Sequence, residues 1–169
     1  MHERAGLGFR DPILGIDPSS STIGWCVLRG SEYDSGCAKF RGELPEKMNQ
    51  YHWWLHDMVE EWRPAIIVLE EPFTPHGNKS FGTAPMVLQQ FKGAALVALA
   101  NVTVPVYWVE SATWKKYVLG HGGITTKQKA EGLIVQQLKG LGFQTSQVDE
   151  ADAVCIALYM RKKFFDRIC

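Results

Sequence analysis

The segment from Leu14 to Trp25 constrains the fold most, because it places one carboxylate at the end of a short apolar strand. The strand leads to Asp17, after which Pro18 and three serines turn the chain, and an apolar segment starts again at Gly24. A carboxylate at the end of a core strand is costly to bury unless an opposite charge or a metal ion compensates it. The sequence therefore indicates a bound cation near Asp17.

The rest of the chain predicts alternating strands and helices. We expect strands at 13–18, 23–29, 33–41, 65–70 and 104–109, and helices at 44–62, 83–101, 111–118, from Thr125 or Thr126 to 141, and 149–165. Short turns separate the first three strands, which predicts an antiparallel meander. The near-continuous apolar run before Glu70 is typical of a strand covered by helices on both faces. Ser111 is expected to cap its helix.

Length and composition favour one soluble domain. The chain has 169 residues, 46% of them hydrophobic and 21% charged, which is ordinary for a globular protein. We expect a flexible, polar N-terminal lead-in at 1–12 and a single domain at 13–169. No apolar run reaches the ~20 residues of a membrane span, and the N-terminus lacks an apolar signal core, so a cytoplasmic location is expected. The zero net charge argues against a strongly basic surface.

The cysteines show no Cys-x-x-Cys spacing and are expected to be free thiols. They are Cys26, Cys37, Cys155 and Cys169, and the apolar surroundings of Cys26 and Cys155 are typical of small core residues.

Three further carboxylates stand at predicted element ends. Glu70 ends an apolar strand, and Asp149 and Asp152 lie at i and i+3 in the first turn of the last helix. Each has an ordinary structural alternative: Asp17 could form a turn, Glu70 could be an exposed strand-end acid, and the two helix acids could be N-terminal caps. Together, acids at the ends of two strands and the start of a helix indicate one acidic site.

Several carboxylates cannot share a site uncompensated, because like charges raise one another's pKa. Oxygen ligands of this kind suit Mg²⁺, with Mn²⁺ as a substitute. Two such ions ~4 Å apart can support phosphodiester cleavage. In that scheme Asp17 would bridge the ions, and Glu70, Asp149 and Asp152 would take the outer positions.

Four motifs occur in an order that resembles the RuvC family of Holliday-junction resolvases, within the RNase H-like (retroviral integrase) superfamily. They are Gly15-Ile16-Asp17-Pro18 with Gly24-Trp25, Leu69-Glu70-Glu71-Pro72-Phe73, Trp114-Lys115-Lys116-Tyr117-Val118-Leu119-Gly120 with Gly122 and Lys127-Gln128, and Asp149-Glu150-Ala151-Asp152-Ala153. Ser19 stands where the family often has Gly, which suits divergent members, including those of phages and other viruses.

The resemblance implies an RNase H-like α/β fold, with three antiparallel strands and then two parallel ones in a five-stranded mixed sheet flanked by helices. It also implies a homodimeric endonuclease that nicks four-way DNA junctions symmetrically, leaving 5′-phosphate and 3′-hydroxyl ends. The implied residues are the metal-binding acids Asp17, Glu70, Asp149 and Asp152, the DNA-contacting lysines Lys115, Lys116 and Lys127, with Lys127 also catalytic, and Phe73, an aromatic that stacks near the junction centre. Because Glu71 follows directly, either acid could be the second metal ligand; the family spacing Glu-x-x-Phe favours Glu70.

Other functions remain open from the sequence. A branched-DNA nuclease that also cuts flaps and forks, and a non-catalytic junction-binding module, both fit the motifs. The segment from Gly15 to Thr22 also resembles the phosphate loop of sugar kinases and actin-like ATPases, but those proteins need two lobes, for which this chain is too short. A partner helicase cannot be identified from the sequence.

Overall fold

The computed structural model describes residues 8–19, 22–72, 83–120 and 127–165, with only the backbone at 83–84, 127–130 and 165. The strands are β1 (Ile13–Pro18), β2 (Ile23–Arg29), β3 (Glu32–Ala38), β4 (Ile66–Glu71) and β5 (Val106–Glu110). The helices are α1 (Leu44–Trp62), α2 (Thr83–Ala98), α3 (Ser111–Leu119), α4 (Lys127–Gly140) and α5 (Val148–Phe165).

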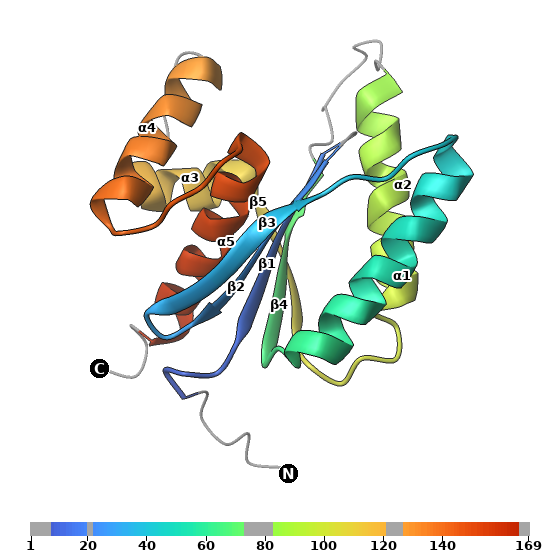
Figure 1. The fold of residues 1–169 in the computed structure, drawn as a ribbon, viewed down its shortest axis with the longest axis horizontal. Helices are drawn as coiled ribbons and strands as arrows, with labels where there is room; N and C mark the ends of the chain where they lie inside the picture. Colours follow the sequence, from blue (N-terminus) through green and yellow to red (C-terminus); the bar gives the residue numbers. More distant parts are fainter. Residues whose placement is uncertain (1–7, 20–21, 73–82, 121–126, 166–169) are drawn as a thin grey trace.

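The five strands form one mixed sheet in the order β3-β2-β1-β4-β5. β1 pairs with β2, and β2 with β3, in antiparallel ladders. β4 pairs in parallel with both β1 and β5. Short turns suffice for the antiparallel pairs, whereas each parallel pair is reached after a helix has carried the chain back. The predicted mixed sheet is confirmed, and β1 lies at its centre (Figure 1).

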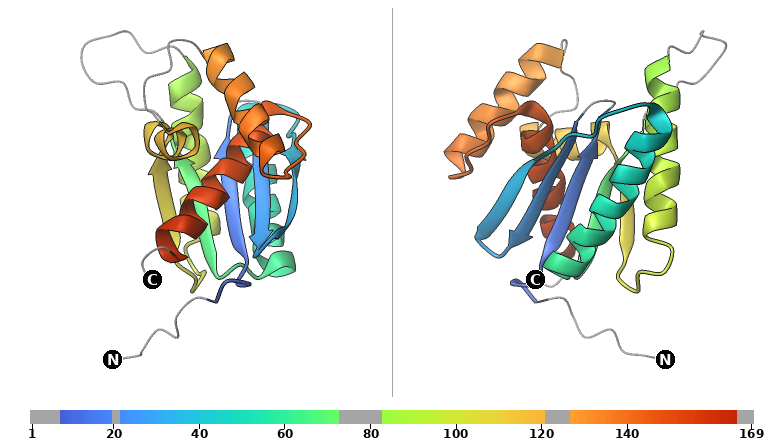
Figure 2. Two further views of the ribbon diagram at one scale, coloured as in Figure 1. Left: turned by 90° about the vertical axis from the view of Figure 1, so that its left-hand side faces the viewer. Right: turned by 45° about the vertical axis from the view of Figure 1, so that its right-hand side comes forward.

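Helices cover the sheet on both faces, with α1 and α2 on one side and α3, α4 and α5 on the other (Figures 1 and 2). Alternate residues of β4 supply the two cores: Ile66 and Val68 pack toward α5, and Ile67 and Leu69 pack toward α1 and α2. This period of two determines which strand-end side chains meet which helices.

α5 packs closely on the centre of the sheet. A Cβ atom on Gly15 of β1 would lie 2.6 Å from the backbone oxygen of Ala153. From Glu150 to Leu158 the helix is buried all around, because α3 and α4 cover its outer side. Glycine at this position of β1 therefore allows α5 to approach the site-bearing strand.

Element ends differ from the predictions by a few residues. β3 ends at Ala38 rather than 41, α2 at Ala98 rather than 101, and β5 begins at Val106 rather than 104. The prediction that Ser111 caps α3 is wrong: the cap position is Glu110, and Ser111 is the first helical residue. The Ser111 hydroxyl instead lies near the Glu70 carboxylate and acts to lower its pKa.

The helices and the cysteines can be compared with two further predictions. In the described parts of the chain, every helix is too short or too polar to cross a bilayer. Cys26, Cys37 and Cys155 are free thiols, as expected, and Cys169 lies outside the described residues.

Candidate active site

Two carboxylates lie side by side at one end of the sheet. β1 and β4 are parallel neighbours, with Ile16 opposite Leu69, so Asp17 and Glu70 follow at adjacent strand ends. Both point to the face covered by α5, because they alternate with residues that pack on the opposite face. The adjacent strands β1 and β4 (Figure 1) thus bring together two acids that are far apart in the sequence.

Glu71 lies on the other face of the sheet from Glu70. Its carboxylate forms an ion pair with Lys92 of α2. Glu70 instead accepts a hydrogen bond of 2.7 Å from the indole N–H of Trp114 in α3. Of the two adjacent acids, Glu70 is therefore the one that faces Asp17.

The first turn of α5 brings two more acids to this edge. Asp149 and Asp152 lie beside the end of β1, and the Ser19 hydroxyl donates to Asp149 Oδ2 over 3.4 Å. A Cβ atom on Gly24 of β2 would lie 1.8 Å from the backbone oxygen of Asp149. The absence of a side chain at Gly24 therefore lets the helix terminus reach the site.

Glu150, between these two acids, stabilises the helix terminus. It is buried, and its carboxylate accepts hydrogen bonds from the backbone N–H and the hydroxyl of Ser146, at 2.7 and 2.8 Å, and from the Ser35 hydroxyl at 2.7 Å. Burial alone would raise the pKa of Glu150, but these hydrogen bonds outweigh it and lower the pKa. Glu150 thus fixes the start of α5 against β3.

α3 contributes residues whose contacts sequence reasoning did not identify. Trp114 is fully buried, and its indole N–H orients the Glu70 carboxylate. Lys115 Nζ lies 3.9 Å from Asp152 Oδ2 and 4.7 Å from the centroid of the Trp114 ring. These contacts could have been anticipated from the position of α3, which begins directly after β5 at the same sheet edge as Glu70.

The acids repel one another. Burial, then the charges of Glu70, Asp152 and Asp149, raise the pKa of Asp17 well above its usual value. Burial also raises the pKa of Glu70, and it raises that of Asp152 to about 7, although Lys115 acts in the opposite direction in both cases. The site therefore favours protonation of its carboxylates or binding of a cation.

The donor set fits a hard divalent cation. All four side chains offer carboxylate oxygens, and Asp152 Oδ1 is buried without a hydrogen-bond partner. Among the described residues, however, no three His, Cys, Asp or Glu side chains form a ready metal-binding group. Trp114 draws Glu70 toward α3, and Lys115 lies beside Asp152, so small side-chain rotations would accompany binding.

The remaining predicted site residues are less closely defined. Lys116 is exposed on α3, next to Lys115. Lys127 begins α4, but its side chain is not among the described parts, and Phe73 lies outside the described residues.

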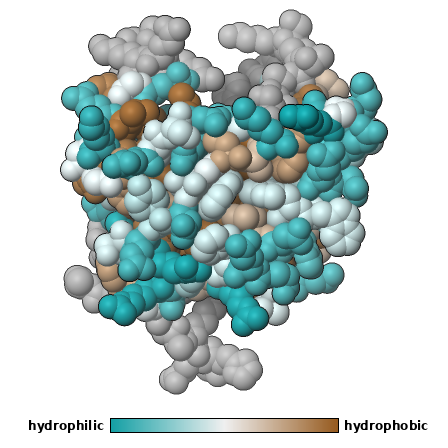
Figure 3. Space-filling view, in the orientation of Figure 1, coloured by the Kyte–Doolittle hydropathy of each residue, from teal (hydrophilic) through white to brown (hydrophobic). Residues whose placement is uncertain are grey.

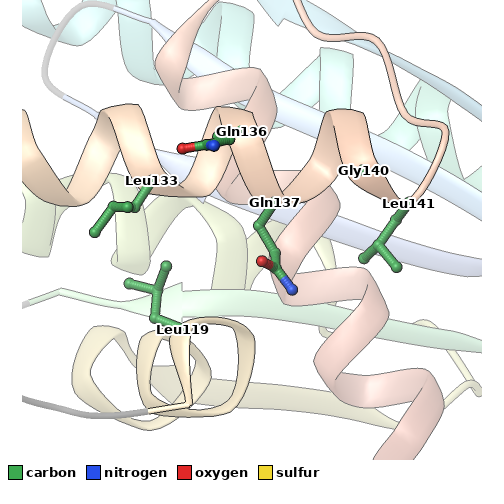
Figure 4. A pocket seen from close by; sticks show the side chains of 6 residues that line it. All are labelled: Leu119, Leu133, Gln136, Gln137, Gly140 and Leu141. Carbon is green, nitrogen blue, oxygen red and sulfur yellow. The ribbon is translucent and has the colours of Figure 1, made fainter.

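A separate open pocket lies between α3 and α4. Figure 4 shows Leu119 of α3 and Leu133 of α4 pointing toward each other across it. The other described lining residues are Gln136, Gln137, Gly140 and Leu141, none with a titratable side chain.

The face of the molecule seen in Figure 3 is mostly polar, with hydrophobic residues in small areas. The acid cluster, rather than this pocket, has groups suited to hydrolytic chemistry.

Known proteins share both sequence and fold with this chain. The family model described as "Crossover junction endodeoxyribonuclease RuvC" matches residues 13–160. RuvC of Aeromonas hydrophila is 32% identical over 152 residues, covering 86% of this chain and 84% of that protein. RuvC of Chloroflexus aggregans is 34% identical over 155 residues, covering 86% and 89%. T. thermophilus RuvC in complex with Holliday junction substrate has the same fold, with a TM-score of 0.70, 23% identity and coverage of 94% and 96%. The chain therefore belongs to the RuvC family of crossover junction endodeoxyribonucleases, which are metal-dependent nucleases.

Proposed function

We propose that this protein resolves four-way DNA junctions by cutting two opposing strands. The observation that carries the proposal is the grouping of Asp17, Glu70, Asp149 and Asp152 at one sheet end in a member of the RuvC family. All four acidic positions of the family motif are present, which favours catalysis over a purely binding role.

The four carboxylates would hold two Mg²⁺ ions, with Mn²⁺ able to substitute. Asp17 is the candidate shared ligand, because it is buried and the charges of Glu70, Asp152 and Asp149 all act on its carboxylate. Glu70, Asp149 and Asp152 would complete the outer positions. When bound, the ions would supply electrostatic stabilisation of the oxygens that become negatively charged during the reaction.

The reaction is hydrolysis of one phosphodiester in each of two strands. Water attacks phosphorus, the bond to the 3′ oxygen breaks, and that oxygen takes up a proton, leaving a 5′-phosphate and a 3′-hydroxyl. Lys115, beside Asp152, is suited to hold a phosphate oxygen by charge. Lys116 and Lys127 are proposed DNA contacts, Lys127 acts near the scissile phosphate, and Phe73 stacks on a base near the junction centre, where stacking is worth ~1–3 kcal/mol.

Paired cutting requires a homodimer, for which α2 is the candidate interface. One side of this region faces the core through Phe91, Ala95 and Leu99. The other side exposes Leu96 and Val97, by 52% and 67%. The exposed apolar residues on α2, which also include Met86, would be covered by a second copy. Sedimentation analysis of the wild type and of Val97→Glu tests this proposal, because the variant should be monomeric.

Substrate choice is tested by comparing labelled four-way junctions, 5′-flaps and linear duplexes in Mg²⁺. Symmetric nicks confined to the four-way junction, with ends that DNA ligase can rejoin, would support resolution. Equal cutting of flaps would identify a branched-DNA nuclease of relaxed selectivity. Tight junction binding without cutting in either metal would leave a binding module.

A further inference from the structure

The chain places two glutamates in succession at the end of β4, and only one of them faces the acid cluster. Glu70 and Glu71 are both partly buried, on opposite faces of the sheet. Because side chains alternate along a strand, a local shift of one residue would exchange the two acids. The buried residues Ile67, Val68 and Leu69 hold the register along β4, and contacts of the half-buried Glu70 and Glu71 add to it at the strand end.

Lys92 of α2 supplies such a contact on the far side of the sheet. Its Nζ forms an ion pair with Glu71 Oε1, with only 25% of the lysine side chain and 29% of the glutamate side chain exposed. The same Nζ lies 4.9 Å from the ring centroid of Trp108 in β5. One lysine therefore contacts both parallel strands close to the ends that carry the site.

The ion pair also neutralises one of two acids that are register partners on neighbouring strands. Glu71 is the register partner of Glu110 on β5, and like charges opposite one another destabilise a sheet. With Lys92 neutralising Glu71, the end of β4 can keep its pairing with β5 through the last residue of both strands.

We propose that Lys92 is a positioning residue of the active site, which holds Glu71 on the α2 face and thereby directs Glu70 toward Asp17 and Asp152. Lys92 touches neither the acid cluster nor, in this proposal, the DNA. The proposal rests on the metal site proposed above, and it assigns a role to a lysine outside the four family motifs.

Mn²⁺ binding in the absence of DNA tests this role, followed by the electron paramagnetic resonance signal of free Mn²⁺. We expect Lys92→Met to weaken binding about tenfold, the size typical for residues that orient metal ligands. Simple electrostatics predicts the opposite sign, because removing a positive charge near the site should tighten Mn²⁺ binding. Lys92→Arg, which keeps the ion pair, should bind Mn²⁺ like the wild type.

Further variants separate positioning from general damage to the fold. Lys47→Met, on α1 in the same helical layer, is the matched control and should leave Mn²⁺ affinity unchanged. Glu71→Gln breaks the pair from its other side; it should weaken binding, and its effect should not add to that of Lys92→Met. If Lys92→Met alone folds poorly, the double variant with Lys92→Met and Glu71→Gln can be measured instead, because it leaves no unpaired, partly buried carboxylate at position 71.

Unchanged or tighter Mn²⁺ binding by folded Lys92→Met would overturn the positioning role, as would fully additive effects of the two changes. Failure of the wild type itself to bind Mn²⁺ would contradict the proposed metal site instead. The two failures are therefore distinguishable within one titration series.

Discussion

Gly24 of β2 and Asp149 of α5 are in such close contact that a Cβ atom on Gly24 would lie 1.8 Å from the Asp149 backbone oxygen. A rigid strand and a rigid helix terminus meet here, so neither can yield as the end of a flexible side chain would. The position of Asp149 and Asp152 relative to Asp17 thus depends on a residue without a side chain.

Gly24→Ala should therefore displace the start of α5. Overpacking of this kind costs ~1–3 kcal/mol of unfolding free energy, and a misplacement of ~1 Å can reduce catalysis about 100-fold. Thermal unfolding and single-turnover junction cleavage measure the two effects. Gly132→Ala on α4, where an added Cβ meets no atom within 4 Å, is the matched control and should be neutral or stabilising. Full cleavage by Gly24→Ala would contradict the account.

Metal-free stability should fall as the pH rises through the range set by Asp152. Its pKa is raised from 3.8 to about 7, so the folded state holds this proton more tightly than the unfolded state. The stabilisation that comes from this bound proton is present in full at a pH below the pKa of Asp152 in the unfolded state. It is lost as the pH rises past the pKa in the folded state. Urea unfolding in EDTA should show a weaker pH dependence for Asp152→Asn than for the wild type. Asp34→Asn, at an exposed position on β3, is the control, and equal pH dependence in all three proteins would contradict the prediction.

Mg²⁺ should reverse this instability by binding only the folded state. We expect added Mg²⁺ to raise the unfolding temperature of the wild type and to have little effect on Asp17→Asn. In EDTA, Asp17→Asn should become the more stable protein as the pH rises, since its amide cannot ionise, whereas the Asp17 carboxyl is buried and three other acids oppose its ionisation. An equal Mg²⁺-induced shift in both proteins would place the metal elsewhere.

Trp114→Phe should weaken metal binding while retaining an aromatic side chain in the core. The change removes the 2.7 Å hydrogen bond to Glu70, and a hydrogen bond to a charged group contributes about 1.5–3 kcal/mol. Losing it raises the pKa of Glu70 further and frees its carboxylate to rotate. Mn²⁺ affinity and the unfolding temperature report these effects. Trp53→Phe, at a tryptophan that is 55% exposed, should change neither.

Lys115 and Lys116 allow a comparison of adjacent lysines in different surroundings. Lys115→Met should slow cleavage about 100-fold, because its charge lies 3.9 Å from Asp152 of the proposed metal site. Lys116→Met should leave the cleavage rate of the bound junction unchanged. It should weaken the salt dependence of junction binding by the amount expected for the loss of about one phosphate contact. Single-turnover rates at saturating protein, together with binding in EDTA, separate the two. Identical losses for both variants would contradict distinct roles.

The strands and their terminal acids could be predicted because each depends on a local pattern. An apolar run followed by a carboxylate is visible in the sequence at Asp17 and at Glu70, and the predicted bounds of β1, β2 and α1 match the structure. Parallel pairing of β1 with β4 then brings the two acids together.

The supporting contacts could not be predicted, because they join residues distant in the sequence. The hydrogen bond from Trp114 to Glu70 spans 44 positions, and Ser35 reaches Glu150 across 115. Glu150 has the same charge as its neighbours Asp149 and Asp152, yet it stabilises the helix start. Only the packing of α5 on β2 and β3 distinguishes these three acids.

The catalytic role of the carboxylate cluster is best tested by single-turnover cleavage of a labelled four-way junction by Asp17→Asn, with junction binding measured on the same preparation. We expect Asp17→Asn to bind the junction as well as or more tightly than the wild type in EDTA and to give no detectable nicks in Mg²⁺, whereas the control Asp34→Asn should cut two opposing strands as the wild type does. Paired nicks by Asp17→Asn at the wild-type rate would contradict the assignment of this carboxylate cluster as the catalytic centre.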